Sequence, residues 1–319
     1  MGTLAVLSPA VQKVEAITIH RNLIDEGERF SSILRDDLYT YSNPLGTSEP
    51  STAVGGGSLS DIFDVAADWW EKAILDPFEI ILNFGWGDMP IDNRKNAILD
   101  LAAIELASEL KNGRIIESNI IFNRNLRDEK NQPSKWFLDQ TPHLNEEYKG
   151  FSEKRRDLGG GLVNVERIFT EPRINSPAIH FDLLTVAKHE IGHALGLDAT
   201  GRKKSDLIGP IIIGNDLPFS GTKLNFDGVH FPVRNKDGSI DNNNVLVNTL
   251  MNDASRFRER RLQSEVDILA VAQASGFTQV NLDPHKVPEP ISILGLLTLG
   301  TLGAFSIMKC KRKQLSRHC

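Results

Sequence analysis

A chain of 319 residues is long enough for one large domain or two small ones, and 40% hydrophobic with 24% charged residues is typical of a folded globular protein. The formal net charge of −6 gives no reason to expect a nucleic-acid partner. Cys310 and Cys319 both lie at the C-terminal end, which excludes a disulfide framework and a cysteine-ligated zinc site from the rest of the chain.

The first sixteen residues have the features of the end of a signal peptide. Residues 4–11 are mostly apolar, and Val14-Glu15-Ala16 carries small residues at the two positions that signal peptidase reads. A positively charged segment before the apolar run is missing. The alternative is that residues 1–16 contribute a first strand of the domain. We expect a remnant of an export signal, and a domain that begins at residue 17.

Helices and strands then alternate along the first half of the chain. Residues 60–75 have helical spacing of apolar side chains, and residues 78–84 alternate in the manner of a strand with one buried face. A second helix is expected over residues 96–111, ended by Asn112-Gly113. Residues 115–123 and 162–169 are expected to form two more strands.

The second half is poorer in regular elements. A helix is expected from Asp182, its N-cap, to Leu197, followed by a long irregular stretch. A last helix over residues 265–274 begins at the capping pattern Ser264-Glu265-Val266-Asp267. These elements predict an α+β fold with two lobes around a cleft and a small mixed sheet.

The helix that begins near Asp182 carries the strongest chemical signal, the segment His189-Glu190-Ile191-Gly192-His193. Histidines four residues apart share one helix face, so both imidazoles reach a single ion, and the intervening glutamate lies beside a metal-bound water without being a ligand. An apolar stripe on the opposite face would anchor the helix. It consists of Leu184, Ala187, Ile191 and Leu195.

The longer segment HEIGHALGL, residues 189–197, resembles the metzincin clan of zinc peptidases. That clan has a glycine three residues after the second histidine, where Gly196 stands, and a methionine in a tight turn below the metal. Asn248-Thr249-Leu250-Met251-Asn252 resembles this Met-turn. The resemblance implies a two-lobed zinc metallopeptidase domain, which we place at residues 17–280, with Glu190 as the catalytic base.

The third zinc ligand departs from the clan pattern, because Ala199 occupies its usual position. His230 resembles the displaced third histidine of clan members that carry an insertion before the Met-turn. Asp198, one position early, is an alternative, since a carboxylate also binds zinc. Glu265 is a third possibility, although its place beside the capping Ser264 favours a helix-dipole role. The expected set is His189, His193 and His230, with Asp198 left open.

The C-terminal end resembles the PEP-CTERM sorting signal of exported bacterial proteins. Residues 281–290 form a proline-rich linker, residues 291–308 are apolar and uncharged, and a basic cluster follows up to residue 313. Eighteen residues reach about 27 Å as a helix, enough to span a bilayer. Residues 287–313 therefore predict a transmembrane helix, processing by an exosortase, and location in the cell envelope or outside the cell.

The function expected from these signals is zinc-dependent endopeptidase activity on proteins or peptides. Zinc would activate a water molecule, and Glu190 would move its proton. In the metzincin clan the substrate pairs with an edge strand, for which residues 115–123 or 162–169 are candidates. The alternative is a non-catalytic, zinc-stabilised envelope or matrix protein. Ala199 favours that alternative, and the intact Glu190 argues against it.

Overall fold

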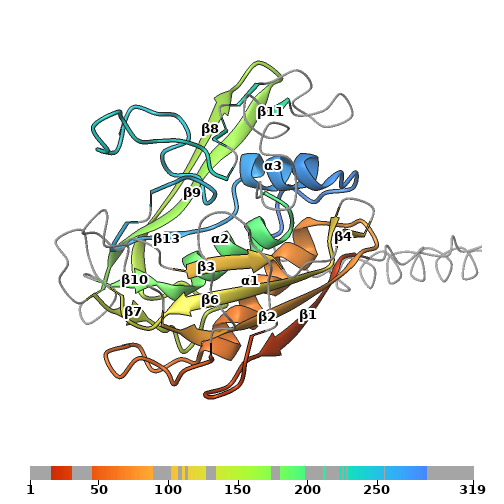
Figure 1. The fold of residues 1–319 in the computed structure, drawn as a ribbon. Coiled ribbons are helices and arrows are strands. Elements are labelled where there is room, and N and C mark those ends of the chain that lie inside the picture. Colours follow the sequence, from red (N-terminus) through yellow and green to blue (C-terminus); the bar gives the residue numbers. More distant parts are fainter. Residues whose placement is uncertain are drawn as a thin grey trace, which may run out of the picture. The chain divides into compact units, whose positions relative to one another are not determined.

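A computed structural model describes residues 16–30, 45–88, 102–106, 110–111, 114–126, 134–173, 180–197, 211–212, 223–224, 226–227, 229–254 and 256–285 (Figure 1). The chain divides into two compact units, Met1–Leu282 and Asp283–Cys319. All elements described below belong to the first unit, so the two lobes we expected are parts of one unit. Residues 1–15, with the expected signal remnant, and the expected sorting signal at residues 287–313 lie outside the described residues.

The fold class expected from the sequence is wrong in its membrane helix. Within the described ranges, no helix is long and apolar enough to cross a membrane. The helices α1, α2 and α3 have 15, 12 and 11 residues, whereas a span needs about 20 apolar residues. Each of the three also carries charged side chains. The fold is α+β, and residues 291–308 fall outside its described part.

A four-stranded sheet forms the base of the unit, in the order β1-β2-β6-β3. Its strands are β1 (Thr18–Leu23), β2 (Glu79–Gly87), β6 (Glu117–Asn123) and β3 (Ala102–Leu106). The first three run parallel, and β3 runs antiparallel to β6 at one end of the sheet. The strands expected at residues 78–84 and 115–123 are therefore confirmed, with somewhat different bounds.

The helix expected over residues 96–111 is wrong where the structure describes that segment. Strand β3 occupies Ala102–Leu106, and the short strand β4 (Leu110–Lys111) pairs with β5 (Arg114–Ile115). The sequence from Ala102 to Leu106 also alternates apolar residues, so it fits a strand period as well as a helical one. Residues 102–106 form a strand because they pair with β6, and the sequence of this segment alone does not reveal that partner.

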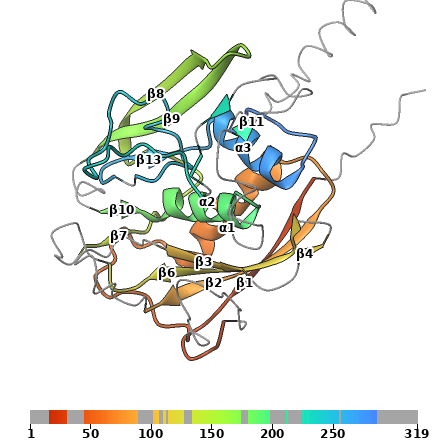
Figure 2. The ribbon, with the colours of Figure 1, turned by 45° about the horizontal axis from the view of Figure 1, so that its top comes forward.

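Helix α1 (Leu59–Ala73) and helix α2 (Leu183–Ala194) lie on the same face of the sheet (Figure 2). Phe63 of α1 is fully buried and stacks on Phe84 of β2, with ring centroids 3.8 Å apart. Trp70 of α1 donates from its indole nitrogen to the Lys188 carbonyl of α2 at 2.8 Å. The expected helix at residues 60–75 is confirmed, and it supports α2 from the sheet side.

The rest of the unit covers the other side of α2. A hairpin of β8 (Tyr148–Asp157) and β9 (Leu162–Pro172) pairs with β13 (Arg260–Arg261) in the order β13-β9-β8. Helix α3 (Glu265–Ser275) begins with the expected capping box and ends at Gly276, whose φ is +66°. Two further small sheets pair β7 (Trp136–Phe137) with β10 (Phe181–Asp182), and β11 (Ile211–Ile212) with β12 (Lys223–Leu224).

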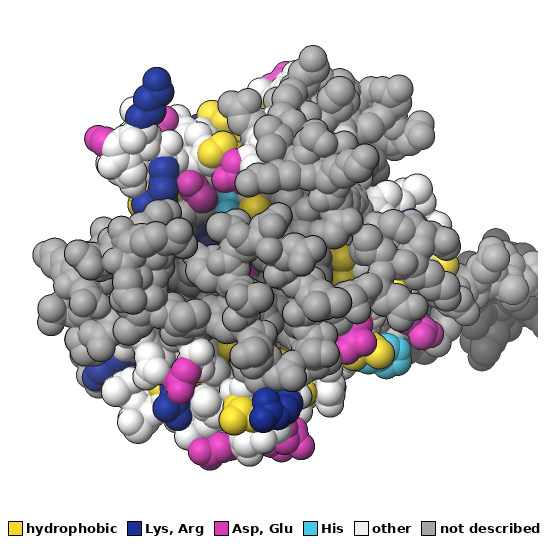
Figure 3. Space-filling model, in the orientation of Figure 1, with side chains coloured by type: hydrophobic (Ala, Val, Ile, Leu, Met, Phe, Trp, Pro, Cys, Tyr) yellow, Lys and Arg dark blue, Asp and Glu magenta, His cyan; other side chains and the backbone are white. Residues whose placement is uncertain are grey.

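Charged side chains of both signs are interspersed on the described part of the face shown in Figure 3. This mixture agrees with a formal net charge of only −6 over 319 residues.

Candidate metal centre

Helix α2 is built from a strong start signal and a strong stop signal. Asp182 is its N-cap and accepts from the Thr185 backbone N–H at 3.0 Å. Gly196 follows the helix with φ +121°, and a Cβ at that position would lie 2.1 Å from Ser275 Oγ. Only glycine fits this close, left-handed turn. The helix expected between Asp182 and Leu197 is confirmed, and its apolar stripe is buried as expected.

The start of α2 is fixed by a buried ion cluster. The Arg260 side chain has no exposed surface and donates to Asp182 and to Asp139, from Nη2 at 2.9 Å and 2.7 Å. Burial alone would lower the pKa of Arg260, but the nearby carboxylates, Asp182 above all, raise it above its usual value. The guanidinium therefore stays charged and ties β13 to the first turn of α2.

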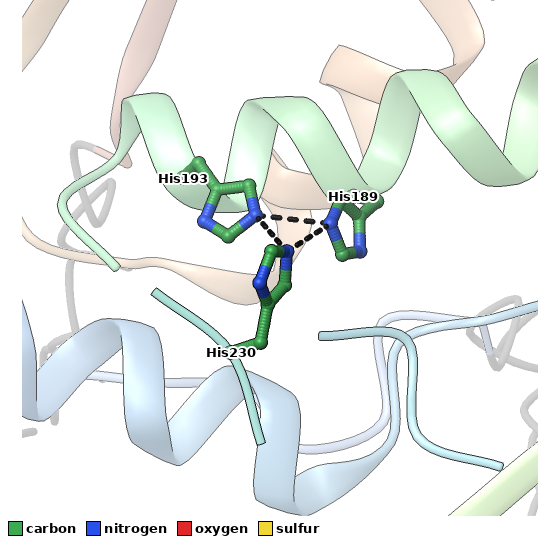
Figure 4. A group of neighbouring side chains, drawn as sticks. All are labelled: His189, His193 and His230. Carbon is green, nitrogen blue, oxygen red and sulfur yellow. Dashed lines mark hydrogen bonds between the residues drawn. The ribbon is translucent and has the colours of Figure 1, made fainter. Parts of the chain in front are cut away.

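Three imidazoles from two distant segments converge beneath α2 (Figure 4). His189 and His193 project from the helix, and His230 approaches from the opposite side on a loop. Their Nε2 atoms are separated by 2.9 Å for His189–His193 and by 3.1 Å for each distance to His230. The sequence assigned these three residues to one centre, and the structure brings them together.

Backbone carbonyls orient the two helix histidines. The Nδ1 atom of His189 lies 2.7 Å from the Leu250 carbonyl oxygen, and that of His193 lies 2.6 Å from the Leu197 carbonyl oxygen. A carbonyl only accepts, so each Nδ1 carries the proton and each Nε2 presents a bare lone pair. Both rings therefore have the tautomer that a metal ligand needs.

The electrostatic environment keeps His189 and His230 neutral. Burial, and then the neighbouring His193, lowers the pKa of His189 to about 3. Burial and the two adjacent rings likewise hold the pKa of His230 well below its usual value. Neutral imidazole is the form that binds metal, so protonation does not compete with a cation at neutral pH.

The arrangement fits a metal ion. Ligands held at 2.0–2.1 Å with tetrahedral angles would have their nitrogens about 3.3 Å apart, slightly more than the spacings here. Two lone pairs facing each other 2.9 Å apart repel each other unless a cation lies between them. The three histidines therefore lie close enough to bind one metal ion.

The loop that carries His230 is tied to its surroundings by backbone groups. Asp227 accepts from the Val229 and His230 N–H groups at 2.9 and 2.7 Å, which closes a tight turn before the ligand. Immediately after the ligand, Phe231 donates its N–H to the Met251 carbonyl at 3.0 Å. The third histidine is thus positioned by the Met-turn segment.

Met251 is fully buried beneath the motif helix. A Cβ atom on Gly192 would lie 2.6 Å from Met251 Sδ and 3.0 Å from Trp70 Cζ2, so the glycine inside the motif is what allows this contact. The backbone N–H groups of Leu250 and Met251 both donate to the Asp267 carboxylate, at 3.0 and 2.9 Å. The sequence indicated Asp267 only as part of a capping pattern, and its role in fixing this turn was missed.

The remaining candidates have different positions. Asp198 and Ala199 lie outside the described residues. Glu265 accepts from the Asn164 N–H at 2.9 Å and from Arg155 at 3.2 Å, so its carboxylate joins the first turn of α3 to the β8–β9 hairpin and is not part of the histidine group. Glu190 follows His189 on α2 and is 8% exposed.

The strands expected to pair with a substrate are both internal. Strand β6 lies between β2 and β3 and is paired along both sides, and β9 lies between β8 and β13, with β13 pairing only at Ile168 and Phe169. In the described part of the sheet, β3 is the terminal strand next to β6, and it contacts α2. The segment mistaken for a helix therefore provides the strand that lies beside the histidine helix.

No protein-family model, curated protein or solved structure matches this chain.

Proposed function

We propose that this chain is a zinc-dependent endopeptidase in which His189, His193 and His230 hold the ion and Glu190 is the general base. The observation that carries the proposal is the convergence of three imidazole Nε2 atoms, two of them from the helix that also carries Glu190. The resemblance of residues 189–197 and of Met251 to the metzincin clan supports the same assignment.

Zinc is the proposed metal because three imidazoles are a typical ligand set for catalytic zinc. Structural zinc sites almost always have four protein ligands, whereas catalytic sites have three and leave a position for water. The described residues provide three ligands in this group. The presence of Glu190 next to His189 argues against the alternative of a non-catalytic, zinc-stabilised envelope protein, because a purely structural site does not need that carboxylate.

When bound, zinc would supply Lewis acidity and make a bound water acidic near neutral pH. The chain's own residues account for the remaining steps. Glu190 accepts the water's proton and returns it to the leaving amine, because its carboxylate follows His189 on the same helix and need not ligate the metal. The Leu250 and Leu197 carbonyls keep His189 and His193 in the ligating tautomer.

Substrate binding is proposed at β3. A terminal strand has backbone groups available for pairing with an extended peptide, which gives affinity without selecting a particular side chain. Because β3 contacts α2, a peptide added there would run along the helix that carries the motif. The proposed substrate is accordingly an unstructured protein segment. Export to the cell envelope is a separate proposal that rests on the sequence alone. Cell fractionation tests it by showing in which fraction the protein is found.

The test compares Glu190→Gln with Glu265→Gln, two isosteric changes at sites of similar burial, 8% and 7% exposed. Zinc content after dialysis and casein hydrolysis with and without a chelator are measured for both. Glu190→Gln is expected to retain zinc and to lose about 10²–10⁴-fold of the activity. Glu265→Gln is expected to remain active. Zinc retention with no chelator-sensitive hydrolysis in the wild type would instead favour the non-catalytic alternative.

A further inference from the structure

The segment from Leu250 to Asp253 runs between two of the metal-binding histidines. On one side, the Leu250 carbonyl orients the His189 ring. On the other side, the Met251 carbonyl and the Asp253 N–H pair with the backbone of Phe231, which directly follows His230, at 3.0 and 3.3 Å. Asn252 lies at the centre of this segment, and its own backbone forms the parallel bridge to Phe231.

The Asn252 side chain connects the backbone of the whole turn. It is 3% exposed, and its Nδ2 donates to the carbonyls of Thr249 at 2.7 Å and Val247 at 2.9 Å, with a longer contact of 3.4 Å to Leu246. Its Oδ1 accepts from the Ala254 N–H at 2.8 Å. One carboxamide thus satisfies backbone groups both before and after Met251.

Asparagine suits this position because the site needs a donor and an acceptor on one short planar group. Aspartate has no donor for the carbonyls, and an apolar residue has neither function. Removing the carboxamide would take this partner from the Val247 carbonyl and the Ala254 N–H, whereas the Thr249 carbonyl also accepts from Arg261 at 3.1 Å and the Leu246 carbonyl from the Thr249 N–H. Buried backbone groups that lose a partner are unfavourable, so the turn would rearrange to find new ones. Any rearrangement would move the Leu250 carbonyl relative to Phe231, and with them His189 relative to His230.

We propose that Asn252 is a positioning residue that sets the distance and orientation between His189 and His230, and thereby the metal affinity of the site. This inference rests on the metal site of the proposed function. The hydrogen bonds of the Asn252 side chain described above go to backbone groups and not to either histidine. It acts through the Leu250 carbonyl on one side and through the paired backbone of Phe231 on the other.

The matched control is Asn83→Ala in the four-stranded sheet. Asn83 is 4% exposed, donates to Glu117 and Asn119 at 2.9 Å each, and accepts from Asn22 at 2.8 Å. Removing either carboxamide breaks several buried hydrogen bonds, so both variants should lose comparable stability. Only Asn252→Ala removes hydrogen bonds from the segment that joins the two ligands.

The experiment measures zinc affinity by competition with a chromophoric chelator, and the visible spectrum of the cobalt-substituted protein. Asn252→Ala is expected to bind zinc about tenfold or more weakly than wild type, as outer-shell changes typically do, and to show altered cobalt bands. Asn83→Ala is expected to match wild type in both. Equal zinc affinity and equal spectra in the two variants would overturn the inference. Absence of zinc binding in the wild type would overturn the proposed function as well.

A measurement on the wild-type protein covers the case in which Asn252→Ala does not fold. Coupling between the turn and the metal is reciprocal, so zinc must stabilise the turn if the turn stabilises zinc. Zinc should slow hydrogen exchange at the amides of Phe231, Met251 and Ala254 by tenfold or more, and should leave the amides flanking Asn83 much less affected. Unchanged exchange at those three amides would refute the role of Asn252.

Discussion

The contact between Gly192 and Met251 gives a quantitative prediction about how the motif helix rests on its support. Gly192→Ala should favour helix formation by about 1 kcal/mol, because alanine has the higher helix propensity. The added Cβ, however, would lie 2.6 Å from Met251 Sδ and 3.0 Å from Trp70 Cζ2, and both side chains are fully buried. Overpacking of this kind costs about 1–3 kcal/mol, so the expected net effect is a loss of about 0–2 kcal/mol.

A double-mutant cycle tests this reasoning. Met251→Ala alone should cost about 2–5 kcal/mol, because it leaves a cavity under α2. In the double variant the Cβ of residue 192 enters that cavity. The double variant should therefore lose at least about 1 kcal/mol less unfolding free energy than the sum of the two single-variant losses. Urea unfolding of the metal-free proteins provides all four free energies. Additive losses, or a stabilising Gly192→Ala, would show that the helix does not rest on Met251 in this way.

Three further results are expected. Asp267→Asn should cost about 2–4 kcal/mol and weaken zinc binding, because Asp267 accepts from two Met-turn amides. Asp76→Asn, which breaks a similar carboxylate–amide contact far from the histidines, should lower urea stability without changing zinc affinity; equal zinc losses would contradict the assignment. Arg260→Met should cost about 3–5 kcal/mol in urea unfolding, because it leaves buried carboxylates without their cation; a neutral effect would disprove the importance of this cluster. Burial, with an added contribution from the Asp139 carboxyl, raises the pKa of Glu147 from 4.5 to about 7. The contribution of the Glu147 carboxyl to the free energy of unfolding is therefore complete below about pH 4.5 and is lost as pH rises through about 7. In the Glu147→Gln variant this pH-dependent loss should be absent. Urea midpoints of both proteins at about pH 5.5 and pH 8 measure it.

Features encoded within one short stretch of sequence were predicted well. The bounds of α2 follow from Asp182 at its start and Gly196 at its end, and α3 follows from the box at Ser264 and Asp267. His230 was predicted from its resemblance to the displaced third histidine of insertion-bearing clan members, and its ring does lie beside the other two. Capping, turns and helix periodicity need no knowledge of distant segments, so a single sequence suffices for them.

Features that depend on distant partners were predicted poorly. The segment that contains Ala102–Leu106 fits two periods, and only the neighbouring β6 makes it a strand. The carbonyls of Leu250 and Leu197 orient two ligands, but every residue has a carbonyl, so no sequence pattern identifies these two. The membrane helix was inferred from a proline-rich linker, an apolar run and a basic cluster at residues 281–313, and the helices in the described ranges are short and carry charges.

The ligands come from segments far apart in the chain, since His193 and His230 are separated by 37 positions. A metal ion held by both closes a loop of that length, much as a disulfide would. Closing a loop of that length costs about 4 kcal/mol of conformational freedom, and an ion that binds only the folded chain offsets part of this cost. His189 and His193 are brought together by one turn of helix, whereas His230 reaches the site only when a distant segment of the chain folds against that helix. Metal supply during folding would therefore govern how fast the second half of the domain docks, and a chain that folds without metal would show its earliest local opening around residues 229–254.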